Sequence, residues 1–220
     1  GRIHPLSDRR SVLRVKRLNS GKEKRLKRRL ACSSFSQVSY VLLGVFLLSM
    51  EGLYGSLLQM VFHALAKNAL FLCAGAVICK TGCTRVKELR GMGKRMPAVM
   101  VCFALASLSL VGIPPAGGFL AKWHLAVGAM RAEDGVFAWL GPAVLMVSAL
   151  LTAGYLFPAI VEGFFPGEDW RKTDQSKDGR LSVSAFMGVP LAVLGISLLV
   201  LGALGNPVFE LLRGIASDMV

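Results

Sequence analysis

Residues 54–79 read YGSLLQMVFHALAKNALFLCAGAVIC, and this run decides the fold. Lys67 is the one charged side chain within it. A membrane-spanning helix needs about 20 predominantly apolar residues, so this run is long enough to cross a bilayer with some tilt. Similar apolar runs lie on both sides of it, and none shows the period-two alternation of a β-strand. The sequence therefore predicts an all-α, polytopic bundle of transmembrane helices.

The charge distribution supports a membrane protein with a defined orientation. The chain has 220 residues and a net charge of +13, yet 54% of its residues are hydrophobic. Of its 26 Lys and Arg residues, 12 lie in residues 1–30 and 6 in residues 80–95, outside the long apolar runs. By the positive-inside rule both basic segments are expected in the cytoplasm, with the chain in the inner or plasma membrane. This pattern excludes a secreted domain, a disordered chain and a free-standing nucleic-acid-binding domain.

The apolar runs and their breakers indicate how the chain is organised. We expect a basic arm over residues 1–21, a transmembrane helical domain over residues 22–207 and a tail over residues 208–220. The chain begins with Gly1 rather than Met, and its first thirty residues lack the apolar core of a signal peptide, so we expect a fragment. Five or six crossings are predicted in the domain, over residues 34–50, 54–79, 96–113, 118–131, 136–160 and 183–204.

One crossing is predicted to be interrupted between Gly112 and Gly118, where the sequence reads GIPPAGG. Pro114 and Pro115 remove two backbone donors, and glycine lowers helix stability, so a continuous helix is unfavourable here. Gly117 is the remaining glycine of the break, between Gly112 and Gly118 in the chain. Interrupted helices are tolerated inside membranes where they face protein or a hydrated cavity, which is where ion sites form.

Lys67 is the first candidate for ion chemistry, because a charge near the middle of a span costs about 2.5–3.5 kcal/mol on insertion scales. Either the side chain is neutral or it faces a hydrated interior and a partner. His63 lies one helical turn away on the same face, and imidazole exchanges protons near neutral pH. Gln59 and Tyr54 could extend this polar line, as could Asn68. The structural alternative is a lysine that snorkels or pairs within the bundle.

Lys122 is the second candidate, because it follows the break in GIPPAGGFLAKWHL and can point into the gap. The alternative is an interfacial lysine beside the aromatic anchor Trp123. His124 lies two residues on and is expected to face away from Lys122. The polar residues that open the first span are interpreted as a helix cap and interhelical hydrogen bonds in preference to ion transfer; they are Ser33, Ser34, Ser36 and Gln37.

The sequence indicates no catalytic centre of its own. It contains no nucleophile with an adjacent base, no phosphate-binding glycine loop and no paired carboxylates within its apolar runs. Cys79 and Cys83 form a CxxxC pair with no further ligands nearby, whereas a structural metal site needs four ligands. We therefore expect packing thiols, with no metal and no cofactor bound by this chain.

Four segments in order resemble the antiporter-like membrane subunits shared by respiratory NADH-quinone oxidoreductase (complex I), Mrp-type Na⁺/H⁺ antiporters and membrane-bound hydrogenases. They are KRRLACSSFSQVSYVLLG from Lys27, FHALAKNALFLCAGAVI from Phe62, KELRGMGKRMP from Lys87 and SLVGIPPAGGFLAKW from Ser109. In that family, two inverted helix repeats each hold half of a proton path, joined by intramembrane lysines and histidines. The resemblance covers residues 22–205 and implies a C-terminal-half fragment, with the first repeat upstream of residue 22.

The resemblance implies roles for three residues: Lys67 as the lysine of the second half-path, His63 as the connecting histidine and Lys122 as the residue on the exit side. It implies a subunit that moves protons, alone or coupled to Na⁺, among other membrane subunits. The alternative is a non-transporting scaffold in the same kind of complex, in which packing glycines such as Gly75 and Gly112 matter and the two lysines do not.

Overall fold

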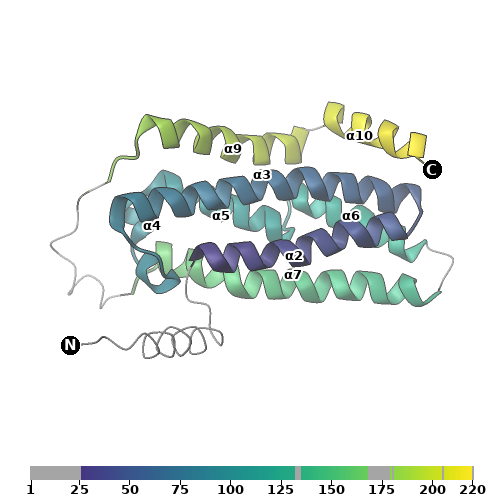
Figure 1. Ribbon diagram of the computed structural model, residues 1–220, viewed down its shortest axis with the longest axis horizontal. Coiled ribbons are helices and arrows are strands. Elements are labelled where there is room, and N and C mark those ends of the chain that lie inside the picture. The colour runs from purple at the N-terminus through teal and green to yellow at the C-terminus, as the bar shows by residue number, and fades with distance from the viewer. Residues whose placement is uncertain (1–25, 132–134, 168–178, 180, 205, 220) are drawn as a thin grey trace, which may run out of the picture.

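The computed structural model describes residues 26–131, 135–167, 179, 181–204 and 206–219. The regular elements in these residues are helices, which confirms the all-α prediction (Figure 1). The expected basic arm over residues 1–21 lies outside the described residues. In chain order the helices are α2 (Leu26–Phe46), α3 (Met50–Thr81), the 3₁₀ turn η1 (Val86–Leu89), α4 (Met92–Arg95), α5 (Pro97–Val111), α6 (Gly117–Met130), α7 (Gly135–Phe164), α9 (Ala185–Leu204) and α10 (Asn206–Met219).

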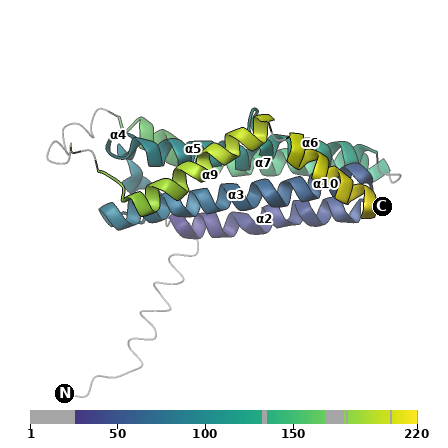
Figure 2. The same cartoon turned by 90° about the horizontal axis from the view of Figure 1, so that it is seen from above.

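Helix α3 is the centre of the bundle. It packs against α6, α2, α5, α9 and α10, and in Figures 1 and 2 it runs between α9 on one side and α2 on the other. Half of the most apolar 18-residue stretch of α3 is buried in the bundle, whereas the buried share of the corresponding stretch is 22% in α7 and 17% in α9. Because α3 carries Lys67, this side chain lies in the interior of the bundle rather than on a face open to lipid.

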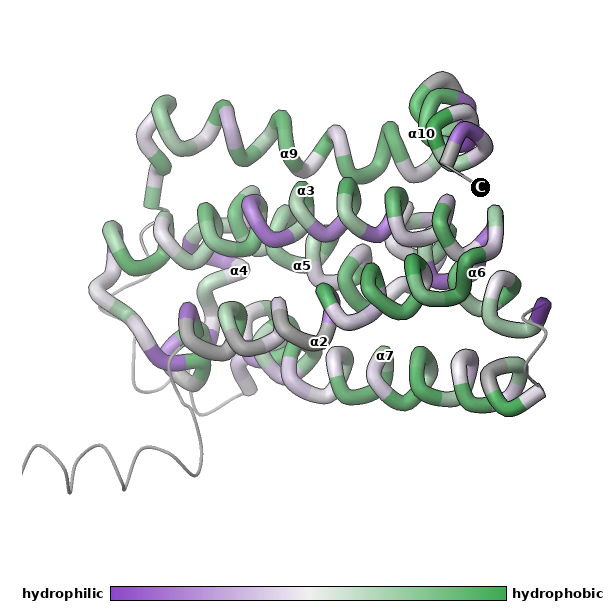
Figure 3. Tube along the Cα trace, turned by 45° about the vertical axis from the view of Figure 1, so that its right-hand side comes forward, coloured by the Kyte–Doolittle hydropathy of each residue, from purple (hydrophilic) through white to green (hydrophobic). Residues whose placement is uncertain are grey.

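The two outer helices expose a mostly apolar surface. Large side chains such as Trp139, Leu150 and Leu151 on α7 and Phe186 on α9 are more than two-thirds exposed. Figure 3 shows hydrophobic colour along most of α7 and α9, whereas hydrophilic segments interrupt α3. Apolar surface of this extent is typical of helices that face lipid or neighbouring subunits.

One end of the bundle collects the residues of the basic loop, and we call it the basic end. There the amide of Leu26 donates to the carbonyl of Thr84 (3.0 Å), so the start of α2 lies beside the loop over residues 80–95. The amide of Leu181 donates to the carbonyl of Arg95 (2.9 Å), which places the chain leading into α9 at the same end. The described last residues of the first basic segment and the loop over residues 80–95 therefore share an end, as expected of segments on one side of a membrane.

Three helices are long and apolar enough to cross a membrane in the described part of the chain: Met50–Thr81, Ala138–Phe164 and Ala185–Ala203. The expected five or six crossings counted shorter helices as well. The span predicted over residues 34–50 differs most, because the helix begins at Leu26 and ends at Phe46, and only Gln37–Phe46 is a continuous apolar stretch. Lys and Arg are good helix formers, so the basic residues before the apolar run join the helix.

Helices α5 and α6 together make one interrupted crossing. Helix α5 has 15 residues and starts at the basic end, and α6 has 14 and runs on toward the opposite end. Neither is long enough alone at about 1.5 Å per residue. The carbonyl of Val99 accepts a hydrogen bond from Cys73, near the end of α3, while Gly117 lies against Phe62, near its middle. The break therefore lies at mid-height of α3.

Close approach of helix backbones holds the break in place. A Cβ on Gly118 would lie 1.9 Å from the carbonyl oxygen of Ser109, and a Cβ on Gly117 would lie 2.0 Å from the ring of Phe62. On the far side, a Cβ on Gly202 of α9 would lie 2.6 Å from the amide nitrogen of Gly117. Gly75 differs from the expectation of a packing glycine, because the nearest atom to its Cβ position is Met187 Cε at 3.8 Å.

We predict that Gly118→Ala destabilises the bundle by about 3 kcal/mol, at the upper end of the usual cost of overpacking, because the added methyl meets backbone that cannot rotate away. Gly75→Ala is the matched control and should leave stability nearly unchanged or slightly raised, since alanine favours the helix. Thermal unfolding of detergent-solubilised protein measures both. Equal melting temperatures for the two variants would contradict the packing described for the break.

Candidate functional site

The break between α5 and α6 has a defined backbone geometry. Gly112 ends α5 with φ 86°, in the left-handed region that favours glycine, and its amide donates to the carbonyl of Leu108. Pro114 and Pro115 follow, joined by a cis peptide bond, and α6 begins at Gly117. The predicted interruption at residues 112–118 is thus confirmed in position.

Lys122 points back from α6 into the gap. Its Nζ donates to the carbonyl oxygens of Leu110 (2.7 Å) and Val111 (2.6 Å), which are the last two residues of α5. These carbonyls have no partner within their own helix, and a cation is favourable at a helix C-terminus. The side chain is buried, which rules out the interfacial interpretation beside Trp123, whose own ring is 56% exposed. A Cβ on Gly112 would lie 2.9 Å from Lys122 Cδ, so glycine is needed here for space as well.

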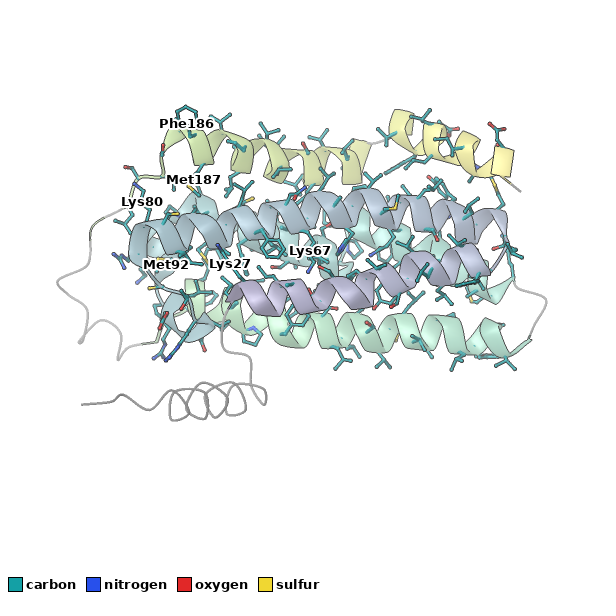
Figure 4. The ribbon with its side chains drawn as sticks, in the orientation of Figure 1. Lys27, Lys67, Lys80, Met92, Phe186 and Met187 are labelled. Carbon is teal, nitrogen blue, oxygen red and sulfur yellow. The ribbon has the colours of Figure 1, made fainter. Side chains whose placement is uncertain are left out.

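Lys67 is bound to helix α2. Its Nζ donates to the carbonyl of Leu30 and to the hydroxyl of Ser33, and the Ser33 hydroxyl in turn donates to Leu30 (2.8 Å). Figure 4 shows Lys67 in the interior, between α3 and α2, while Lys27 and Lys80 lie at the basic end. The lysine is 6% exposed, so it does not snorkel to a surface.

A polar stripe on α2 runs from Lys67 to Lys122. It consists of Ser33, Gln37 and Tyr40, which are spaced i, i+4 and i+7, lie on one helix face and are all buried. Ser33 binds Lys67 at one end, and the ring of Tyr40 lies 5.9 Å from the Nζ of Lys122 at the other. Gln37 stands between them. We call this set the α2 stripe.

Helix α3 contributes a second polar line opposite the α2 stripe. Gln59 Nε2 donates to Gln37 Oε1 (2.7 Å), so this side chain links α3 to the α2 stripe. His63 lies on the same face of α3, between Gln59 and Lys67. Asn68 is exposed and points elsewhere. The site thus lies between two helices, α2 and α3, and ends at the break of α5 and α6.

Several buried polar atoms along this line have no hydrogen-bond partner in the protein. Within the described residues they include Gln37 Nε2, Gln59 Oε1, His63 Nδ1 and, beside the break, Ser109 Oγ. Buried polar groups are normally satisfied, and ordered water fills that role where protein does not. The line of donors and acceptors between the two lysines is therefore suited to hold water.

The sequence also indicated three auxiliary residues for the path, Gln59, Tyr54 and His124, and they lie in two separate places. Gln59 belongs to the line between the lysines, whereas Tyr54 and His124 lie against each other, with ring centroids 4.7 Å apart. His124 is bound to Glu51 and faces away from the break, as its spacing from Lys122 predicts. Ser33 and Gln37 do make interhelical contacts, but the sequence interpretation missed that Ser33 binds Lys67 and that Gln37 lies on the same helix face as Ser33. The sequence feature that could have shown this is the spacing of Ser33, Gln37 and Tyr40, which places all three on one face of α2.

The fold and the site define a class of protein: a polytopic membrane subunit with an interrupted helix and two buried lysines. Residues 18–152 match the family described as NADH:quinone oxidoreductase/Mrp antiporter, TM, which is more than half of the chain. The chain belongs to this family. The match confirms the resemblance inferred from the four segments.

Named relatives agree with this membership. The chain is 40% identical over 190 residues to NADH-quinone oxidoreductase subunit N of Desulforudis audaxviator, covering 83% of this chain and 37% of the relative. It is 31% identical over 196 residues to an Na(+)/H(+) antiporter subunit of Alkalihalophilus pseudofirmus, covering 88% of this chain and 38% of the relative. The chain thus spans less than two-fifths of the length of these relatives.

Solved structures of similar fold are multisubunit membrane complexes. A chain of the Mrp complex from a Dietzia species superposes with a TM-score of 0.76 and 28% identity, covering 91% of this chain and 44% of that one. A chain of respiratory complex I from Thermus thermophilus with bound NADH gives 0.71 and 25%, covering 89% and 39%.

We predict that Gln37 and Gln59 are energetically coupled. Either single change to Leu strands the other amide in a buried site and should cost about 1–3 kcal/mol, whereas the double variant removes both groups and should cost less than the sum. A double-mutant cycle on chemical unfolding of the detergent-solubilised protein measures the coupling. Additive costs would show that the two amides do not interact.

Proposed function

We propose that this chain supplies the second half of an intramembrane proton path in a complex I-like or Mrp-like assembly. Lys67 takes a proton from the upstream half by way of His63 and releases it toward Lys122. Other membrane subunits of the complex supply the driving step, which is redox chemistry or sodium exchange. The chain itself binds no cofactor in this proposal, and its transported ion is H⁺, alone or exchanged for Na⁺.

The observation that carries the proposal is the buried polar connection between the two lysines. A charge inside a membrane protein is costly and is usually functional. Here two lysines are buried in one bundle, and the α2 stripe and Gln59 fill the distance between them with hydrogen-bonding groups. Lysines that only tie helices together do not require further buried polar groups between them.

Electrostatic coupling provides the means to move the proton. Two unit charges several Å apart, at an effective dielectric constant near 20, interact by a few kcal/mol. A change of charge near Lys67 therefore alters its affinity for a proton by a large factor. A proton that leaves Lys67 for the α2 stripe moves away from the first charge and toward Lys122.

A non-transporting scaffold is the second candidate, and one observation favours it. Lys122 caps the free carbonyls at the end of α5, which would stabilise the break whether or not protons move. In this role Lys67 and Lys122 act as helix-to-helix ties. The two functions differ in what happens when each lysine is replaced by an uncharged side chain of similar length.

The proposed location is the inner or plasma membrane, with the basic end in the cytoplasm. The basis is the positive-inside rule applied to the segments over residues 1–30 and 80–95. The path then runs from the middle of the bundle toward the opposite, non-cytoplasmic end, because α6 leads from Lys122 in that direction.

We predict that Lys67→Ala abolishes proton pumping by membrane vesicles that contain the complete complex. The buried amine is the proton carrier, so its loss interrupts the path. Lys80→Ala is the matched control, because Lys80 lies on the same helix but is exposed at the basic end, and it should pump normally. Quenching of a pH-sensitive dye measures both.

The scaffold function predicts a different result. If Lys67→Met and Lys122→Met both assemble and pump like the unchanged complex, the lysines serve structure alone and the transport proposal is wrong. The amount of assembled complex in each membrane preparation separates a folding defect from a transport defect.

A further inference from the structure

A second cluster of titratable side chains lies at the end of the bundle opposite the basic end. Glu51 is in the first turn of α3, and its Oε2 lies 2.7 Å from Nδ1 of His124 on α6. Arg131 Nη1 lies 3.6 Å from the other carboxylate oxygen. The side chains of His124 and Glu51 are 29% and 26% exposed, so the pair reaches both the packed interior and water.

The protein holds this pair in a close-packed setting. A Cβ on Gly55 would lie 2.7 Å from the amide nitrogen of Leu125, and a Cβ on Gly128 would lie 2.6 Å from that of Gly52. Helices α3 and α6 therefore touch backbone to backbone next to His124 and again one turn further along α6. The buried ring of Tyr54 meets the imidazole edge to face and closes the inner side of the cluster.

Helix α10 borders the same cluster. It packs along α3, with the ring of Phe209 at 6.3 Å from that of Phe62. Its Glu210 and Arg213 act electrostatically on Tyr54, as Glu51 does. Among the residues that the structure describes, the charged and titratable groups around Tyr54 and His124 are Glu51 of α3, Lys122 of α6, Arg131 directly after α6, and Glu210 and Arg213 of α10.

The position of the cluster along α6 relates it to the lysine site. His124 follows Lys122 by two residues, which is a rise of about 3 Å along the helix, on the opposite face. From there α6 continues to its end at Met130, with Arg131 next in the chain. The cluster therefore lies between the level of the buried lysine and the end of the bundle.

We propose that the Glu51–His124 pair is the proton outlet of this chain. The inference rests on the proposed transport function and names the groups that complete it. A proton leaves the ammonium of Lys122, which becomes a neutral amine, and passes through water to the imidazole–carboxylate pair. The pair then transfers that proton to bulk water and returns to its starting state, so no other reactant is consumed.

The chemistry of the pair suits this role. Glu51 accepts the Nδ1 proton of His124, which orients the ring and leaves Nε2 as the nitrogen that gains and loses the second proton. Arg131 does not replace the histidine as the partner of Glu51, because its contact with the carboxylate is longer and its side chain is 68% exposed. An ion pair at a surface that served stability alone contributes little, whereas a partly exposed imidazole is an effective proton relay.

The test uses vesicles that contain the complete complex, with pumping followed between pH 6 and pH 9. His124→Ala is expected to slow pumping several-fold, and imidazole added to the buffer should restore it, because a small base can reach a partly exposed outlet. Lys67→Ala should be inactive with or without imidazole. Asp218→Asn, on the exposed last turn of α10, is the control for loss of a carboxylate outside the cluster, and it should keep the unchanged rate and pH profile.

A second pair of variants tests the carboxylate. Glu51→Asp should retain most of the pumping and Glu51→Gln should not, since only the former keeps a proton acceptor. The outlet is refuted if His124→Ala pumps at the unchanged rate at every pH, if imidazole does not restore it, or if the two Glu51 variants behave alike. In each case a defect in Lys67→Ala would leave the transport function standing. Normal pumping by Lys67→Ala would instead refute the transport function itself.

Discussion

The hydrogen bonds from Lys122 to the last carbonyls of α5 are the interaction on which the site depends. An interrupted helix leaves carbonyl groups without partners in an apolar interior, where each is costly. Lys122 satisfies two of them from the next helix along the chain. These two hydrogen bonds hold α5 and α6 together at the break. They also bury the lysine amine in the middle of the bundle and fix its position relative to Tyr40 on α2. One side chain thereby satisfies the free carbonyls at the break and places a titratable amine inside the bundle.

Helix α3 relates the other parts of the structure to this bond. Its middle lies against the break through Phe62, its Lys67 binds α2, and its first turn carries Glu51. Along this single helix of 32 residues the order is Glu51, Phe62 and then Lys67. Polar groups therefore occur along α3 from the interior to one end, with Lys67 held by α2 and Glu51 held by α6. This arrangement is compatible with transport in steps, in which a charge at one level changes the proton affinity at the next.

Part of this arrangement was predictable from the sequence. Lys67 and Lys122 are isolated charges in apolar runs, and GIPPAGG contains two prolines and three glycines, so the lysines and the break were evident from local chemistry. The partners were not, because Gln59 and Gln37 are 22 residues apart and His124 and Glu51 are 73 apart. Such pairs depend on which helices pack together. Glu51 follows an apolar run in the sequence, and nothing local to it indicates that it begins α3 beside a histidine of α6.

The central claim is that the polar connection between the lysines carries protons. The most direct measurement is the pumping rate of vesicles containing the complete complex with both Gln37→Leu and Gln59→Leu. This double change keeps both lysines and exchanges the central hydrogen bond for apolar contact at little cost in stability. We predict that the complex assembles normally and that pumping falls severalfold or more. Pumping at the unchanged rate by the assembled double variant would contradict the account.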